Sequence, residues 1–338
     1  RAELAACGSV VAYVELTQKG RLPRLQPPRR MSGGDAMEID AATRRNLELV
    51  RTMSGARDGS LLAVIDRTVT GSGGRLLAAR LAAPLTDAAA IRARHDAVGW
   101  FADVPRLLED VRARLRAAPD MERALTRLTI GRGGPRDLGA VRDGLTVAVE
   151  LRAVLEASAD PPDDIVSAAA RLGEHGVLID RLYVDETGIN SLKIRHNNVL
   201  GYFIDVTTAQ ADNIPTGDGS PFIHRQTLAS AMRFTTVELG ELEGKLAQAG
   251  ERALAMELEL FDDLVTETTA RAEAVSAAAA ALAMLDVSSA LAALAIDRRY
   301  VRPQVDDGTA FSISNGRHPV VEAALASTRD GSFVANDC

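Results

Sequence analysis

The chain has 338 residues, of which 46% are hydrophobic and 25% are charged, and its 46 acidic and 39 basic residues give a net charge of −7. This composition excludes an intrinsically disordered chain, and the length allows two or three domains with a buried core. No run of eighteen apolar residues occurs, which argues against a membrane span. The two cysteines lie at opposite ends of the chain, which argues against a disulfide framework and favours a reducing cytoplasm.

Two short segments open the chain. Residues 4–16 are apolar and predict a helix. The glycine and prolines between residues 20 and 28 would interrupt any helix. We therefore expect the end of one domain, followed by a linker.

Residues 40–157 predict an all-helical domain. Asp40, Ser60 and Asp87 each precede an apolar stretch and can cap the helix that follows. The helix after Asp40 should extend far enough to include Val50.

The glycine-rich stretch 71–75 could be taken for a phosphate-binding loop. It lacks the Gly-Lys-Ser/Thr ending of such loops, and it predicts the start of a helix instead. The whole chain has no Walker A motif, no His/Cys/Asp cluster with the spacing of metal ligands and no catalytic triad pattern. The sequence therefore predicts neither a catalytic residue nor a metal ligand.

The pattern changes at Thr187. Apolar and polar residues alternate across 191–206, with the turn sequence His-Asn-Asn at 196–198, and this pattern predicts a β-hairpin. A third short strand is expected near Phe222. The residues of this region that suit phosphate oxygens are Lys193, Arg195, Asn197, Asn198, Arg225 and Arg233.

Charge balance leaves the meaning of this basic cluster open. Residues 190–238 hold four basic and four acidic residues, so the region has no net charge. An ordinary solvated hairpin face remains as an alternative to a phosphate contact.

Residues 239–300 predict one long helix. Leucine, alanine and methionine recur there at spacings of three and four, as in a coiled-coil seam. A helix of this length would span roughly 90 Å. The alternative is two helices with a break near Glu251. Beyond the helix, Ala310–Ser314 predicts a strand that opens a new domain, and Pro319 predicts the first residue of a short helix.

Several segments together resemble the MutS family of DNA mismatch repair proteins, in its bacterial form. They occur in the family's order and span nearly the whole chain: Met37–Glu48, Leu81–Leu85, Pro135–Leu138, Ser191–Ile194, Asn198–Ile204, Arg225–Leu228, Glu238–Leu239 and Gly316–Glu322.

The resemblance implies a domain order. We expect a connector tail and linker at 1–30, a helical core with a short inbound lever at 31–186, a β clamp at 187–238, a returning lever helix at 239–300 and the beginning of an ATPase domain at 301–338. The expected fold is therefore mainly α, with a small β-hairpin clamp inserted and a truncated α/β ATPase start.

The resemblance also implies functions for some residues. The clamp of this family holds the DNA backbone without reading sequence, and Ser230 joins the six residues above as an expected DNA contact. In this sequence, residues 227–230 lack the Lys and Asn that some family members have there, which weakens the expected DNA contact at this stretch. Phe333 and Val334 would pack on the adenine of ATP.

The resemblance further implies ATP and Mg²⁺ as ligands of the intact parent, and duplex DNA, a second subunit and a MutL-type protein as its partners. The bacterial cytoplasm, in association with the nucleoid, is the expected location.

Two departures from the family limit these expectations. The mismatch-reading domain and the Walker A loop are missing, so we expect no mismatch reading and no ATP hydrolysis from this chain alone. The segment between Pro162 and Thr187 reaches only roughly 36 Å as a helix, well short of the returning lever.

Two other interpretations remain open: a helical arm that oligomerises without binding DNA, and a clamp-lacking branch of the family, against which the hairpin argues.

Overall fold

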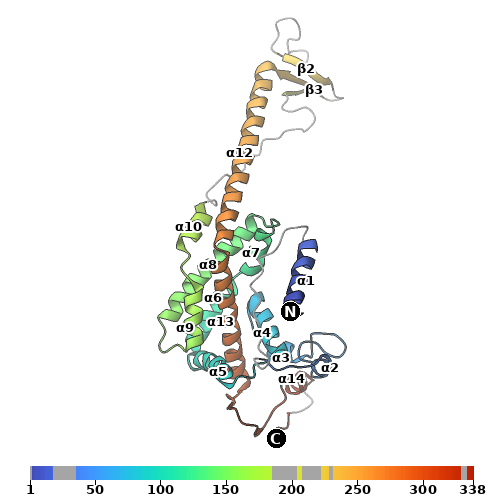
Figure 1. Cartoon of the computed structure of the whole chain (residues 1–338). Helices are drawn as coiled ribbons and strands as arrows, with labels where there is room; N and C mark the ends of the chain where they lie inside the picture. Colours follow the sequence, from blue (N-terminus) through green and yellow to red (C-terminus); the bar gives the residue numbers. More distant parts are fainter. Residues whose placement is uncertain (1, 18–35, 185–203, 208–221, 228–230, 329–332) are drawn as a thin grey trace. The chain divides into compact units, whose positions relative to one another are not determined.

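The computed structural model describes residues 2–17, 36–184, 204–207, 222–227, 231–328 and 333–338, and these residues are mainly helical (Figure 1). The chain divides into two compact units. We call Arg1–Val184 with Val265–Cys338 the core unit, and Asp185–Leu264 the inserted unit.

The core unit is built from helices. They are α1 (Ala2–Thr17), α2 (Ala41–Asn46), α3 (Leu61–Ile65), α4 (Gly71–Ala82), α5 (Ala88–Asp103), α6 (Pro105–Ala117), α7 (Met121–Thr129), α8 (Pro135–Glu156), α9 (Asp163–Leu172), α10 (Gly176–Val184), α13 (Ala272–Arg298) and α14 (Pro319–Thr328), together with the last turns of α12 (Val237–Ala270).

Helix α13 is the centre of this unit, and α4, α5, α7 and α9 pack against it (Figure 1). Its buried positions are mostly alanine and serine with a few leucines, so that neighbouring helices can approach closely. By length and composition alone α13 could cross a membrane, although it contains no unbroken run of eighteen apolar residues. Because 67% of its most apolar window is buried inside the protein, we identify it as a core helix.

Two glycines allow the closest helix contacts. A Cβ atom on Gly73 of α4 would lie 2.2 Å from an oxygen of Asp286 on α13. A Cβ atom on Gly144 of α8 would lie 2.1 Å from Met121 Cγ at the start of α7. Both contacts therefore need a residue without a side chain.

The predicted helix starts are confirmed. Asp40 accepts hydrogen bonds from the amides of Ala42 and Thr43, Ser60 caps α3 and Asp87 caps α5. The predicted length of the helix after Asp40 was wrong, because α2 ends at Asn46 and does not include Val50. The short side chain of Asp40 fixes the start of the helix, but no buried face extends it, since α2 has no buried residue.

In the inserted unit the described strands are β1 (Ile204–Thr207), β2 (Phe222–Thr227) and β3 (Ala231–Thr236). They form an antiparallel sheet in the order β1-β3-β2, so the expected strand near Phe222 is confirmed. Most of the predicted 191–206 hairpin lies outside the described residues, and its described end forms β1, which pairs with β3.

The helical region 239–300 is two helices, and the division falls at Arg271 between α12 and α13. The prediction of one continuous helix was therefore wrong, and the break that the alternative placed near Glu251 lies at Arg271 instead. The three glycines within α12 do not end the helix. The break instead follows a threonine-rich turn, in which the Thr269 hydroxyl donates a hydrogen bond to the carbonyl of Val265. The amide of Arg271 bonds to Thr268 three residues back, which tightens the last turn.

The strand expected at Ala310–Ser314 does not form. The backbone of Ile313 exchanges two hydrogen bonds with Cys338, at 2.7 and 2.8 Å, and Gly316 forms an isolated antiparallel bridge with Asn336. Alternation alone did not provide the run of paired partners that a strand needs. The predicted start of α14 at Pro319 is confirmed.

Candidate functional site

The predicted phosphate-contacting residues fall in the inserted unit. Of these, Arg225 lies on β2 and Arg233 on β3, the central strand. The others, Lys193, Arg195, Asn197, Asn198 and Ser230, lie outside the described residues.

Arg225 occupies an irregular position of the sheet. The register between β2 and β3 passes from His224↔Phe234 to Gln226↔Arg233, so Arg225 has no register partner on β3. This is the arrangement of a β-bulge, which bends a strand and increases its twist. The alternation of the sequence contained no signal for the bulge.

Arg233 has partners in both neighbouring strands. It stands opposite Asp205 of β1 and opposite Gln226 of β2. The register therefore places an acidic residue opposite this arginine, and the sequence of the region has no net charge.

The second predicted site is the pair Phe333 and Val334. Phe333 is half-buried, whereas Val334 is 75% exposed. The two hydrogen bonds between Asn336 and Gly316, at 2.7 and 3.0 Å, fix the backbone that follows them. The pair therefore presents apolar surface to solvent, more of it at Val334 than at Phe333.

Arg317 ties this segment to the end of α13. Its guanidinium donates to the carbonyls of Arg298 at 2.7 Å and Arg299 at 3.2 Å, and it pairs with Glu322 of α14 at 2.8 Å. It also lies over the ring of Tyr300, 5.4 Å from the ring centre. The last carbonyls of a helix have no partners within the helix, so Arg317 completes the C-terminus of α13. In the sequence, Arg317 was noted only as part of the segment Gly316–Glu322, and its contacts with the end of α13 were not predicted.

Asp286 connects α13 to the start of α4. Its carboxylate accepts hydrogen bonds from the amides of Val69 and Thr70 and from the Thr70 hydroxyl, the last two at 2.7 and 2.6 Å. Burial raises the pKa of this carboxyl, and the bonds from Thr70 and Val69 and the charge of Arg112 oppose the rise.

This contact explains the glycine-rich stretch 71–75. The stretch begins α4, as predicted, and Thr70 caps the helix through the amide of Gly73. The anion held there is the carboxylate of Asp286 from the same chain, in the position where a phosphate-binding loop would hold phosphate.

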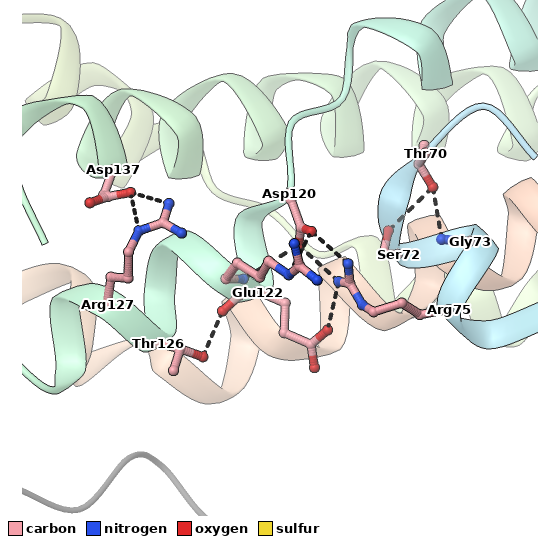
Figure 2. Close-up of polar contacts among 10 residues, drawn as sticks. Thr70, Ser72, Gly73, Arg75, Asp120, Glu122, Thr126, Arg127 and Asp137 are labelled. Atoms are coloured by element: carbon pink, nitrogen blue, oxygen red, sulfur yellow. Dashed lines mark hydrogen bonds and ion pairs between the residues drawn. The ribbon is translucent and has the colours of Figure 1, made fainter. Parts of the chain in front are cut away.

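A chain of ion pairs continues from α4 along α7, as Figure 2 shows. Arg75 of α4 binds Asp120 through two hydrogen bonds of 2.7 and 2.9 Å, and it lies 3.4 Å from Glu122. The bond from Arg75 lowers the pKa of Asp120. At the other end of α7, Arg127 binds Asp137 of α8 and lowers the pKa of that carboxyl in the same way.

Metal ligation finds no support in the part of the chain that the structure describes. No group of three or more His, Cys, Asp or Glu residues lies there in a position to hold a metal ion.

Comparison with known proteins gives a consistent result. The family profile described as MutS domain III matches residues 42–292. The DNA mismatch repair protein MutS of Azorhizobium caulinodans is 51% identical over an alignment that covers 100% of this chain and 41% of that protein. The proteins of the same name from Rhodopseudomonas palustris and Rhizobium meliloti are each 48% identical and cover 100% of this chain, with 42% of their own length matched.

These alignments have two quantitative consequences. The chain spans about two fifths of the length of the curated relatives that it matches. Since the alignment to the Azorhizobium protein has 386 positions and this chain has 338 residues, at least 48 aligned positions have no residue in this chain.

Proposed function

Because the chain belongs to the MutS family, we propose that it acts in bacterial DNA mismatch repair as the part that grips duplex DNA and couples the grip to an ATPase. The match of domain III over residues 42–292 carries this proposal. In it, residues 1–30 are the connector tail, 31–186 the helical core, 187–238 the clamp, 239–300 the returning lever and 301–338 the start of the ATPase domain.

The proposed grip is a contact with phosphate oxygens. Lys193, Arg195, Arg225 and Arg233 supply positive charge, and the amides of Asn197 and Asn198, with the hydroxyl of Ser230, supply neutral donors. The bulge at Arg225 supports a sheet that is specialised for this contact, since bulges locally change the direction of a strand. Such contacts carry no sequence information, so binding should not depend on the base sequence.

The proposed coupling runs through α13. Asp286 joins the middle of this helix to the start of α4, and Arg317 joins its end to α14. A buried helix with fixed contacts along its length moves as a rigid element, so a displacement would pass from one contact to the other.

The proposed ligand of the C-terminal segment is the adenine of ATP. The exposed surface of Val334 and the accessible part of the Phe333 ring fit a flat aromatic base. Bound ATP would supply the free energy of hydrolysis in the parent protein. The described residues contain no cluster that fits Mg²⁺, so its ligands are not assigned to this part of the chain. A second subunit, a MutL-type partner and the bacterial cytoplasm complete the proposal for the parent.

Charge reversal at two positions tests the grip. In the variant Lys193→Glu with Arg195→Glu, the affinity for a fluorescently labelled homoduplex should fall at least tenfold, because two phosphate contacts become repulsive. The matched control is Lys245→Glu with Arg252→Glu, which reverses two exposed bases on α12 of the same unit. Equal affinity losses in both variants would indicate diffuse attraction and contradict a clamp.

A second candidate function is a helical arm that pairs with another copy of the chain. The observation in its favour is that every residue of α12 from 251 to 260 is exposed, including the apolar residues Leu254, Met256 and Leu258. Exposed apolar side chains in such a group commonly mark an interface. The 48 or more missing alignment positions are consistent with the loss of a segment that would cover them.

Sedimentation velocity separates the two candidates. An oligomerising arm predicts a concentration-dependent dimer that Leu254→Glu with Leu258→Glu abolishes and that the polar control Glu257→Gln leaves intact. A chain that stays monomeric at all concentrations and binds DNA would contradict the oligomerising arm.

A further inference from the structure

A cavity of about 340 Å³ lies in the core unit between α4, α5 and α13. Most of its lining is apolar. The apolar residues around it are Ile65, Leu77, Leu81, Pro84, Leu85, Ile91, Val98 and Leu291. Its volume is within the range of small-molecule sites, at the lower end.

Three polar side chains also line this cavity: Arg80 from α4, and Arg94 and His95 from α5. Neither guanidinium makes a hydrogen bond or an ion pair with any residue that the structure describes. Burial and, to a smaller extent, the charge of Arg94 lower the pKa of Arg80 to about 10, and the charge of Asp164 opposes them. Burial also lowers the pKa of Arg94.

His95 adds an unused polar atom. Its Nδ1 is buried and has no hydrogen-bond partner among the described residues. Burial lowers the pKa of its ring, so the imidazole is neutral at pH 7 and can donate or accept one further hydrogen bond.

This arrangement is electrostatically incomplete. Arg80 and Arg94 are both half-buried, so that they repel each other beside an apolar surface and lose part of their hydration. The nearby acid, Asp164, carries one negative charge against two positive charges and lies beyond ion-pair distance of both. One anionic group placed between the guanidiniums would correct the balance and would accept hydrogen bonds from both of them.

The edge of the cavity limits what can enter. The backbone at Pro84 and Leu85 already pairs with Ala36 and Met37, through the bridge Ala36↔Leu85 and the hydrogen bond from the Met37 amide to the Pro84 carbonyl at 2.8 Å. An extended peptide therefore cannot add to this edge as a further strand. A short apolar chain needs no backbone partner and could contact the aliphatic side chains of the lining instead.

We propose that this cavity binds a small anionic amphiphile, with its carboxylate or phosphate head between Arg80 and Arg94 and its short apolar chain against Leu77, Ile91 and Leu291. The site shares no residue with the proposed DNA and nucleotide contacts, and it does not depend on them.

Isothermal titration calorimetry with four eight-carbon probes tests the chemistry of the site. Octanoate and octyl phosphate should bind, and their relative affinities show which head group is preferred. Octanol and octylammonium should bind at least tenfold more weakly, because they present no negative charge to the arginines. Binding of octanol as tight as that of octanoate would overturn the proposal.

Two variants test the location. Arg80→Gln with Arg94→Gln should weaken octanoate binding at least tenfold, whereas the control Arg171→Gln, at an exposed arginine on α9, should leave it unchanged. Unchanged affinity in the double variant would overturn the proposal.

Nuclear magnetic resonance of the unmodified chain gives a readout that does not depend on how the variants fold. The imidazole signals of His95 should shift during the octanoate titration, and those of the exposed His318 should not. Saturating octanoate without a shift at His95 would also overturn the proposal.

Discussion

Helix α13 and the stretch of α12 from residue 251 to 260 have similar apolar residues and opposite environments. Both are rich in alanine and leucine. In α13 the side chains of Leu282, Leu285 and Val287 are buried, whereas every residue from 251 to 260 of α12 is exposed. Apolar content and helical spacing therefore predict the helix in both cases, but they do not predict what covers it.

The charged residues of the two helices explain part of this difference. The α12 stretch includes Glu251, Arg252, Glu257 and Glu259, which remain hydrated in an exposed helix. The middle of α13 contains one acid, Asp286, and its carboxylate is fully hydrogen-bonded by the start of α4. A buried charge in a core helix is tolerated because specific donors replace water.

The largest expected effect comes from truncating a buried leucine of α13, and the same truncation of an exposed leucine of α12 is its comparison. Leu285→Ala in α13 should lower the free energy of unfolding by about 3 kcal/mol, because the residue is fully buried and its removal leaves a cavity. Leu258→Ala in α12, where the residue is 56% exposed, should change it by less than about 0.5 kcal/mol. Urea denaturation of both variants measures the contrast, and equal losses would contradict the difference in burial.

A somewhat smaller loss is expected where α4 meets α13. Gly73→Ala places a Cβ atom within 3 Å of Asp286 and should destabilise the protein by about 2 kcal/mol through overpacking. Gly99→Ala in α5 is the control, since nothing lies within 4 Å of its added Cβ. The control should stabilise by up to about 1 kcal/mol, because alanine favours the helix more than glycine does. A destabilising Gly99→Ala would show that helix propensity does not decide the result.

The loss from Asp120→Asn should be about 1 kcal/mol, since both partners of the pair with Arg75 are partly exposed to water. The pKa of Asp120 is lowered in the folded protein. Its contribution to stability is therefore present above the usual aspartate pKa, and it disappears as the pH falls through the lowered value.

The smallest effect concerns how stability depends on pH at Asp286. The pKa of this group is raised in the folded protein, so the fold binds its proton more tightly than the unfolded chain does. The contribution of Asp286 to stability is therefore greatest below the usual aspartate pKa, and it is lost as the pH rises through the folded value.

Denaturation from pH 2.5 to 7 tests both signs together. The stability difference between wild type and Asp120→Asn should grow with rising pH, and the difference between wild type and Asp286→Asn should shrink. Slopes of the same sign would show that burial does not dominate at Asp286.

Local features of the fold could be predicted from the sequence, and contacts between distant segments could not. The caps Asp40, Ser60 and Asp87 act on amides two or three residues away, so their spacing alone identified them. Asp286 bonds to residues 216 and 217 positions earlier in the chain, and no local pattern encodes such a pairing.

The candidate site divides in the same way. The basic residues of 190–238 and the apolar pair Phe333 and Val334 could be named from sequence and resemblance. The bulge at Arg225 depends on the register of two strands, and the position of Arg317 depends on the end of α13. The Arg80 and Arg94 cavity has no sequence signal, since the two arginines are ordinary members of their helices until α4 and α5 bring them together.

The most direct test of the central claim is the fluorescence anisotropy of a labelled homoduplex titrated with this chain across a salt series. A clamp that contacts phosphates predicts a dissociation constant on the order of 10⁻⁴–10⁻⁶ M, whatever the base sequence. The four basic residues of the proposed clamp predict a slope of roughly −2 to −4 for log affinity against log salt. Absence of binding at low salt, or a slope near zero, would contradict the claim that this chain grips DNA.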